Sequence, residues 1–165
     1  MKDTATGEGL GQSVAIARFM CNTHPESGLY GSTAYETAKI DEVVDAHYAA
    51  LNLTAMKFLP AVFGYKPISK DEFTESSKKF KDHLKALDEL IKDKEFFVGD
   101  KLSLADVYLV SSLNLIFAIF IDAGFKKAIP SLTKWYETTR TQAAFEHHLG
   151  KARFCNKAFA PQFTT

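Results

Sequence analysis

A helix-capping signal directly before a long apolar run constrains this chain more than any other feature. Ser103 precedes Asp106 by three residues, and residues 104–122 after the serine are apolar on almost every face. In a capping box the serine hydroxyl accepts a hydrogen bond from the backbone N–H three residues on, and the carboxylate there accepts one from the serine N–H. We therefore give Ser103 and Asp106 a structural role rather than a catalytic one. A helix that is apolar on every face belongs in the centre of a core.

Composition indicates one ordinary domain. The 165 residues are enough for a sizeable core, and 14 phenylalanines point to a core rich in bulky aromatic side chains. Lys and Arg together number 20, as do Asp and Glu, so the formal net charge is zero. A neutral chain has no overall field that favours nucleic acid or an anionic membrane surface. We expect neither kind of partner.

The cysteines and the apolar segments favour a cytoplasmic protein. Cys21 and Cys155 lie far apart without metal-ligand spacing, which favours two reduced thiols over a disulfide. The N-terminal residues lack the basic and apolar regions of a signal peptide. The longest apolar segment, residues 107–121, is shorter than the ~20 residues that span a bilayer, so we interpret it as a core helix.

Turn residues and apolar spacing predict the elements of the first half. Three glycines indicate a loop or the tip of a hairpin over residues 1–11. A short helix over residues 12–20 follows, with Ser13 as its expected N-cap. A long helix begins near Ser32, because apolar side chains then recur at spacings of three and four. The end of that helix is expected to be broken or kinked by Pro60, Gly64 and Pro67.

The second half is predicted to be helical as well. Ser69 and Glu72 form a second capping-box pattern at the start of an amphipathic helix. The core stripe of this helix comprises Phe73, Phe80, Leu84, Leu87 and Ile91. Its lysines alternate with acidic residues, which is typical of a solvated face rather than a basic patch. Gly124 is expected to end the central helix, and two further helices are predicted over residues 130–140 and 144–151.

These elements together predict an all-α fold. No segment of the sequence has the alternation of a strand, so we expect an antiparallel helical bundle around the buried central helix. Aromatic residues mark the C-terminal tail, at Phe154, Phe159 and Phe163. They fit equally well a tail that docks a partner and a tail that folds back on its own bundle.

Several of these segments resemble one known family. Residues 98–106, with Val98-Gly99-Asp100 before the capping box, are similar to the motif that starts the central helix in the helical C-terminal domain of glutathione transferases. Gln12-Ser13-x-Ala15-Ile16 resembles the motif that closes their thioredoxin-like N-terminal domain. Leu29-Tyr30-Gly31 resembles the linker between the two domains, and Pro130-x-Leu132-x-x-Trp135 resembles their penultimate core helix. The resemblance implies a thioredoxin-like remnant with linker over residues 1–26 and a helical domain over residues 27–165.

Within this family, the C-terminal part is similar to the transferase-like domain of the gamma subunit of translation elongation factor 1. The similar segments are residues 125–130, 134–136 and 145–155. That resemblance implies a module without catalysis that holds the nucleotide-exchange subunits of the elongation factor 1 complex together. Other subunits of that factor are then the expected protein partners, and a homodimer is a further candidate.

The same resemblance suggests one candidate ligand site. In glutathione transferases the residues that correspond to Gln12 and Ser13 bind the γ-glutamyl part of glutathione, and a helix N-terminus suits a carboxylate. The competing interpretation is that Ser13 only caps its helix, and we favour it because the rest of the pocket has no counterpart in this sequence. The first strands and the catalytic residue of the family also have no counterpart here. We therefore expect no catalytic residue and no cofactor, with glutathione as a weak candidate.

The spacing of the histidines does not support a metal site. His147 and His148 are adjacent, so on a helix they diverge by about 100° and cannot bind one metal ion from one face. No histidine spacing typical of a metal site occurs, and we expect no metal. Two alternatives to the elongation-factor interpretation stay open. The chain is a fragment or divergent member of the glutathione transferases, or it is an accessory structural subunit of a larger assembly.

Overall fold

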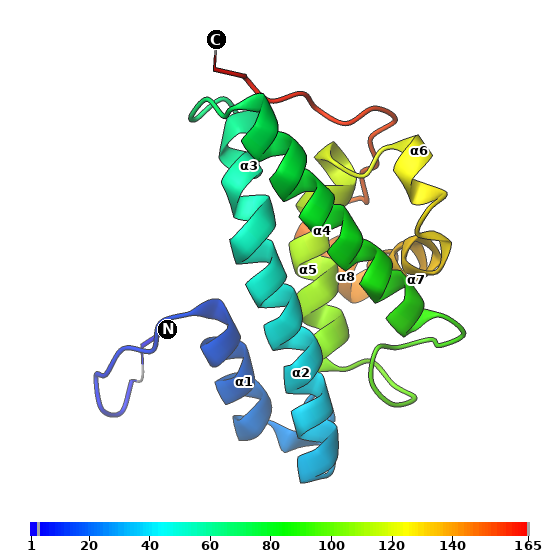
Figure 1. Cartoon of the computed structure of the whole chain (residues 1–165). Coiled ribbons are helices and arrows are strands. Elements are labelled where there is room, and N and C mark those ends of the chain that lie inside the picture. The colour runs from blue at the N-terminus through cyan, green and yellow to red at the C-terminus, as the bar shows by residue number, and fades with distance from the viewer. Residues whose placement is uncertain (3, 165) are drawn as a thin grey trace.

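The computed structural model describes residues 1–2 and 4–164, which form helices and connecting loops (Figure 1). The helices are α1 (Ser13–Thr23), α2 (Ala34–Ala50), α3 (Met56–Val62), α4 (Lys70–Ile91), α5 (Leu104–Ile119), α6 (Ala123–Lys126), α7 (Pro130–Arg140) and α8 (Ala143–Leu149). Pairing between extended segments in this described part is limited to two isolated β-bridges, Lys2 with Gly9 and Ile68 with Phe163. The predicted all-α class is therefore confirmed, and the first bridge closes the N-terminal turn.

The central helix is α5, as the sequence predicts. It lies behind α2 and α4 in Figure 1, with its N-terminal capping box formed by Ser103 and Asp106. Its buried residues cover most of its circumference: Leu104, Ala105, Asp106, Leu109, Val110, Leu113, Ile116 and Phe117. Because α5 carries apolar side chains on nearly every face, the other helices pack around it and shield it from solvent.

The carboxylate of Asp106 does more than cap α5. Its Oδ2 accepts hydrogen bonds from the Ser103 N–H and hydroxyl, at 3.0 and 2.8 Å. Its Oδ1 accepts from the Phe97 N–H at 3.0 Å and from the Trp135 indole N–H at 3.2 Å. Since Asp106 is fully buried, these bonds join the loop before α5, the start of α5 and the middle of α7 at one point.

The prediction that Gly124 ends the central helix is wrong. Helix α5 ends at Ile119, and the N–H groups of Phe120 and Ile121 both donate to the Ile116 carbonyl. Gly124 lies inside the short helix α6, whose N-cap is Asp122, with its carboxylate accepting from the Phe125 N–H at 2.8 Å. The aspartate cap was the stronger local signal, because a residue that starts one helix cannot continue another.

The long helix near Ser32 begins at a threonine cap and carries a distortion that the sequence did not predict. Thr33 caps α2 by accepting from the Glu36 N–H. A π-helical turn, η2 (Leu51–Ala55), joins α2 to α3. Pro60 is tolerated within α3, and Gly64 ends that helix with a positive φ of 74°, as the turn chemistry predicts.

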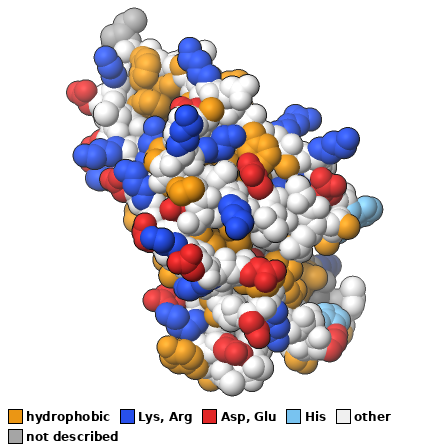
Figure 2. Space-filling view, turned by 90° about the vertical axis from the view of Figure 1, so that its right-hand side faces the viewer, with side chains coloured by type: hydrophobic (Ala, Val, Ile, Leu, Met, Phe, Trp, Pro, Cys, Tyr) orange, Lys and Arg blue, Asp and Glu red, His pale blue; other side chains and the backbone are white. Residues whose placement is uncertain are grey.

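Helix α4 agrees with its predicted cap and core stripe. The Ser69 hydroxyl accepts from the Glu72 N–H at 3.1 Å. Phe80, Leu84 and Leu87 are buried. On the face that Figure 2 presents, lysines and arginines alternate with acidic side chains, and hydrophobic side chains lie exposed between them. The interleaved charges match a solvated surface.

The C-terminal tail folds back along the bundle. Its backbone hydrogen-bonds to Phe117 and Ile119 of α5, and farther on to Ala61 and Ile68. Phe154 packs edge-on against Phe117, whereas Phe159 stays 58% exposed. The tail is thus partly folded back and partly available to a partner.

Both cysteines are free and buried, as expected for two reduced thiols. None of the described helices is long and apolar enough to cross a membrane.

Candidate functional site

The start of α1 carries the candidate glutathione contacts, Gln12 and Ser13. Both side chains are exposed, and Gln12 has a φ of 65°, which is unusual for a residue other than glycine. The expectation that Ser13 is the N-cap is wrong. The helix already includes Ser13, the cap position belongs to Gln12, and no side-chain cap bond forms. Both side chains are therefore free of a helix-capping role.

A shallow cavity of about 230 Å³ lies beside this helix start, between α1 and α2. Its lining residues are Gln12, Val14, Ala15, Arg18, Asp45 and Tyr48. Ser13 is not among them, so the structure does not bring both candidate residues to one concave site.

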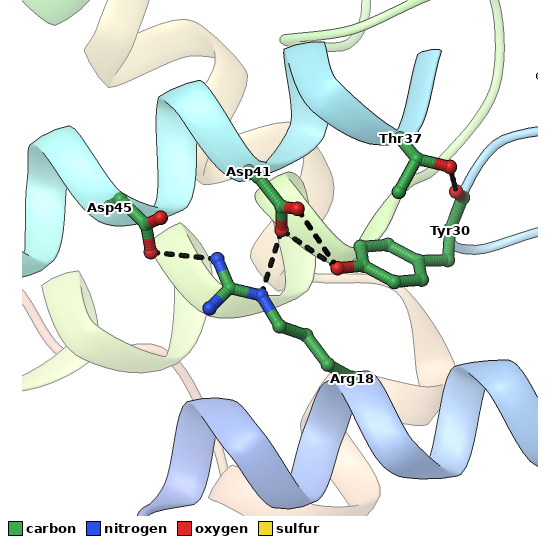
Figure 3. Close-up of polar contacts among 5 residues, drawn as sticks. All are labelled: Arg18, Tyr30, Thr37, Asp41 and Asp45. Carbon is green, nitrogen blue, oxygen red and sulfur yellow. Dashed lines mark hydrogen bonds and ion pairs between the residues drawn. The ribbon is translucent and has the colours of Figure 1, made fainter. Parts of the chain in front are cut away.

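Arg18 fastens α1 to α2 next to this cavity (Figure 3). Its Nε donates to Asp41 Oδ1 and its Nη2 donates to Asp45 Oδ1, each at 2.7 Å. The Tyr30 hydroxyl donates to the same Asp41 carboxylate at 2.9 Å. The Thr37 hydroxyl donates to the Tyr30 carbonyl at 2.8 Å, which fixes the linker before α2. The cluster thus binds the first helix and the linker to one face of α2.

Tyr30, Cys21 and Cys155 are poorly suited to act as a nucleophile or to activate a thiol. Burial and the Asp41 carboxylate raise the pKa of Tyr30 to about 12, so its phenol stays protonated. Burial likewise raises the pKa of the Cys21 and Cys155 thiols. A nucleophile or a thiol-activating group needs the opposite shift. The cluster at Arg18 is therefore best explained as a structural clamp.

The described residues contain no group of three or more His, Cys, Asp or Glu side chains that could hold a metal ion. The structure does bring together three polar residues that lie far apart in the sequence. His47 Nδ1 lies 2.9 Å from His83 Nε2, and His47 Nε2 lies 2.9 Å from the Ser112 hydroxyl. They come from α2, α4 and α5, so no spacing along the chain predicts their meeting.

Burial keeps this cluster neutral. It lowers the pKa of His47 to about 3, with a contribution from nearby His83, and it also lowers the pKa of His83. The Ser112 hydroxyl lies within bonding distance of the Tyr108 and Leu109 carbonyls. If the hydroxyl donates there, it accepts from His47 Nε2–H, and His83 then donates to His47 Nδ1. The cluster is a satisfied core network that joins three helices.

Two exposed apolar areas are better suited to contact with another protein. Because α1 has no sheet to pack on, we expect its apolar residues Val14, Ile16 and Phe19 to be exposed. Phe19 is 45% exposed, as is its neighbour Met20 at 52%, whereas Val14 and Ile16 are half-buried. A second area is a groove of about 580 Å³ between α2 and the end of α4. Its apolar floor includes Val43, Leu87, Leu90 and Phe97.

Comparison with known proteins agrees with the helical arrangement. The family described as glutathione S-transferase, C-terminal domain, matches residues 50–143. A probable elongation factor 1-gamma 2 of Arabidopsis thaliana is 30% identical over 142 residues, which are 86% of this chain and 34% of that protein. A glutathione S-transferase of Emericella nidulans is 26% identical over 132 residues, which are 80% of this chain and 50% of that protein.

Among solved structures, the GST-like domain of elongation factor 1-gamma from Saccharomyces cerevisiae superposes with a TM-score of 0.85. The match covers 94% of this chain and 74% of that domain at 16% identity, so it concerns the fold. This chain spans about a third of the length of the elongation factor relative. The resemblance that the motifs indicate, to the transferase C-terminal domain and to elongation factor 1-gamma, is confirmed.

Proposed function

Since this chain belongs to the glutathione S-transferase C-terminal domain family, we propose that it is a non-catalytic interaction module of the elongation factor 1 complex. The observation that carries the proposal is its likeness to elongation factor 1-gamma over 86% of its length. In this role it contacts the nucleotide-exchange subunits and holds them in the complex, in the cytoplasm. We retain the division into an N-terminal remnant, residues 1–26, and a helical domain, residues 27–165, as part of this proposal.

The chemistry of the described residues supports a module without catalysis. Tyr30, Cys21 and Cys155 all have raised pKa values and are thus poor activators or nucleophiles. The exposed apolar area at Phe19 and the groove between α2 and α4 offer surface for a protein partner. Such contacts need complementary shape and a rigid scaffold rather than reactive groups.

Co-purification tests the proposal directly. The tagged chain is mixed with recombinant nucleotide-exchange subunits of elongation factor 1, and the proposal expects a stable complex on size-exclusion chromatography. A structural subunit unrelated to elongation factor 1 would not bind them, and neither would an isolated transferase fragment. Sedimentation of the chain alone measures whether it also forms a homodimer.

Glutathione conjugation is the second candidate function, favoured by the similarity to a glutathione S-transferase of Emericella nidulans. It requires turnover of a chromogenic electrophile with glutathione, and we expect none from this chain. We propose at most a weak glutathione contact at Gln12 and Ser13. Titration with millimolar glutathione while the Ser13 amide is observed by NMR tests it, and an unmoved signal refutes the contact.

A further inference from the structure

The charges of this neutral chain are distributed unevenly. Residues 123–165 contain seven Lys or Arg residues but only two acidic ones. The ion pairs of the described residues all use cations from the preceding part of the chain, Arg18 through Lys92. The C-terminal region that forms α6, α7, α8 and the tail therefore carries an excess of positive charge, and its cations form no ion pair with an acidic side chain among residues 1–2 and 4–164.

A cleft of about 260 Å³ lies within this region, between α5 and the end of α8. Asn114 and Leu115 line it from α5, while Leu149, Lys151 and Arg153 line it from α8 and the tail. Both leucines are partly exposed, at 43% and 36%. The charged residues of the lining are thus both cations, and they stand next to apolar side chains.

A third cation lies directly behind this lining. Arg140 is fully buried, and its Nε donates to Asn114 Oδ1 at 2.9 Å. Its Nη2 donates to the Leu149 and Gly150 carbonyls at 3.1 and 2.7 Å. All these acceptors are neutral, and Nη1 has no hydrogen-bond partner among the described residues.

Arg140 has two consequences for the cleft. Its hydrogen bonds hold the α5 wall and the α8 wall together, which fixes the shape of the cleft. Because a buried charge is weakly screened, its field also adds to those of Lys151 and Arg153. The cleft is therefore a preformed site that attracts negative charge beside a small apolar surface.

We propose that this cleft binds an acidic peptide segment of a partner protein, with a large apolar side chain next to its carboxylates. The carboxylates pair with Lys151 and Arg153, and the apolar side chain packs on Leu115 and Leu149. A structured or single-stranded RNA fits less well, because such ligands need stacking surfaces and a long track of phosphate contacts. The inference rests on the proposed function, since it specifies the chemistry of one partner of the interaction module.

A peptide titration tests the site in isolation. The probe is a short fluorescein-labelled peptide of repeated Glu-Glu-Leu triplets, whose binding to the full chain is followed by fluorescence anisotropy. We expect saturable binding that K151E and R153E each weaken about tenfold, as loss of a charge-assisted contact predicts. L115A should also weaken it, because the peptide then loses its apolar contact.

Matched controls make the result decisive. K78E reverses an exposed charge on α4 and should leave peptide affinity unchanged. The circular dichroism spectra of all four variants should match that of the unaltered chain. A Gln-Gln-Leu peptide or a Glu-Glu-Gly peptide should bind more weakly than the Glu-Glu-Leu probe. Equal binding by K78E and K151E overturns the site, as does stronger competition by single-stranded RNA of the same net charge.

The co-purification experiment separates this inference from the proposed function. If K151E and R153E still retain the elongation factor subunits as well as the unaltered chain does, the cleft is refuted and the interaction module stands. If the unaltered chain binds the acidic peptide but retains no subunit, the module in that complex is refuted and the cleft stands.

Discussion

Replacement of Asp106 by alanine should destabilise the bundle more than loss of any exposed charge. The fully buried carboxylate accepts hydrogen bonds from the N–H groups of Phe97, Ser103 and Trp135 and from the Ser103 hydroxyl. In D106A the hydroxyl can turn elsewhere, but three buried N–H donors lose their acceptor. Each buried N–H donor left without an acceptor costs about 1–3 kcal/mol. Part of this loss is offset, because the variant no longer has to desolvate the carboxylate on folding. We expect a net loss on the order of 4 kcal/mol.

Urea unfolding measures this loss, with circular dichroism and the fluorescence of the single tryptophan as probes. In a thermal scan the same loss corresponds to a drop of roughly 8–16 °C for a chain of this size. The exposed Asp82, which pairs with Lys85, supplies the control, and D82A should melt with the unaltered protein. A D106A protein within about 1 kcal/mol of the unaltered one would refute the view that this carboxylate joins three segments.

The pH dependence of the same site has a definite sign. Burial outweighs the hydrogen bonds and raises the pKa of Asp106 above its ordinary value of 3.8. A raised pKa means that its contribution to stability is full below 3.8 and is lost as the pH rises through the folded-state pKa. The difference in unfolding free energy between the unaltered protein and D106A should therefore be larger in acid than at neutral pH.

Three further perturbations test other parts of the fold. Burial lowers the pKa of His47 from 6.5 to about 3, so its contribution to stability is full above pH 6.5 and is lost as the pH falls. Urea unfolding of the unaltered protein should therefore show a decrease in unfolding free energy on the order of 4 kcal/mol in acid, and H47L should lack this decrease. R18M breaks the ion pairs with Asp41 and Asp45 and should speed amide exchange in α1 at a cost of about 1 kcal/mol, because both pairs are partly screened by water. S69A leaves the Glu72 N–H without its cap and should cost about 1 kcal/mol in thermal unfolding, whereas unchanged melting would show that water replaces the cap.

Local signals in the sequence predicted the parts of the fold that depend on neighbours along the chain. Ser103 with Asp106 and Ser69 with Glu72 marked two helix starts, because a cap bond joins residues three apart. Where two local signals compete, a single sequence does not rank them. Gly124 favours a helix end, but Asp122 just before it caps a new helix that includes the glycine.

The sites that the sequence did not reveal depend on contacts between distant segments. His47 and His83 are 36 residues apart, and Arg140 reaches Asn114 over 26 residues. The sequence shows only that His47 lies on the apolar stripe of one helix and that Arg140 lies in the last turn of another. Each has an ordinary explanation as a packed or solvated side chain, so only the packing of the helices identifies a partner.

Buried polar contacts of this kind bear on how the bundle works as a scaffold. Apolar surfaces tolerate sliding between helices, whereas a buried hydrogen bond is satisfied at one relative position. Asp88 of α4 accepts from the Leu132 N–H of α7 at 2.7 Å, Trp135 of α7 donates to Asp106 of α5, and Arg140 joins α7 to the end of α8. Each helix around the C-terminal cleft therefore has a fixed register. A partner then meets a surface that is already ordered, which lowers the entropy lost on binding.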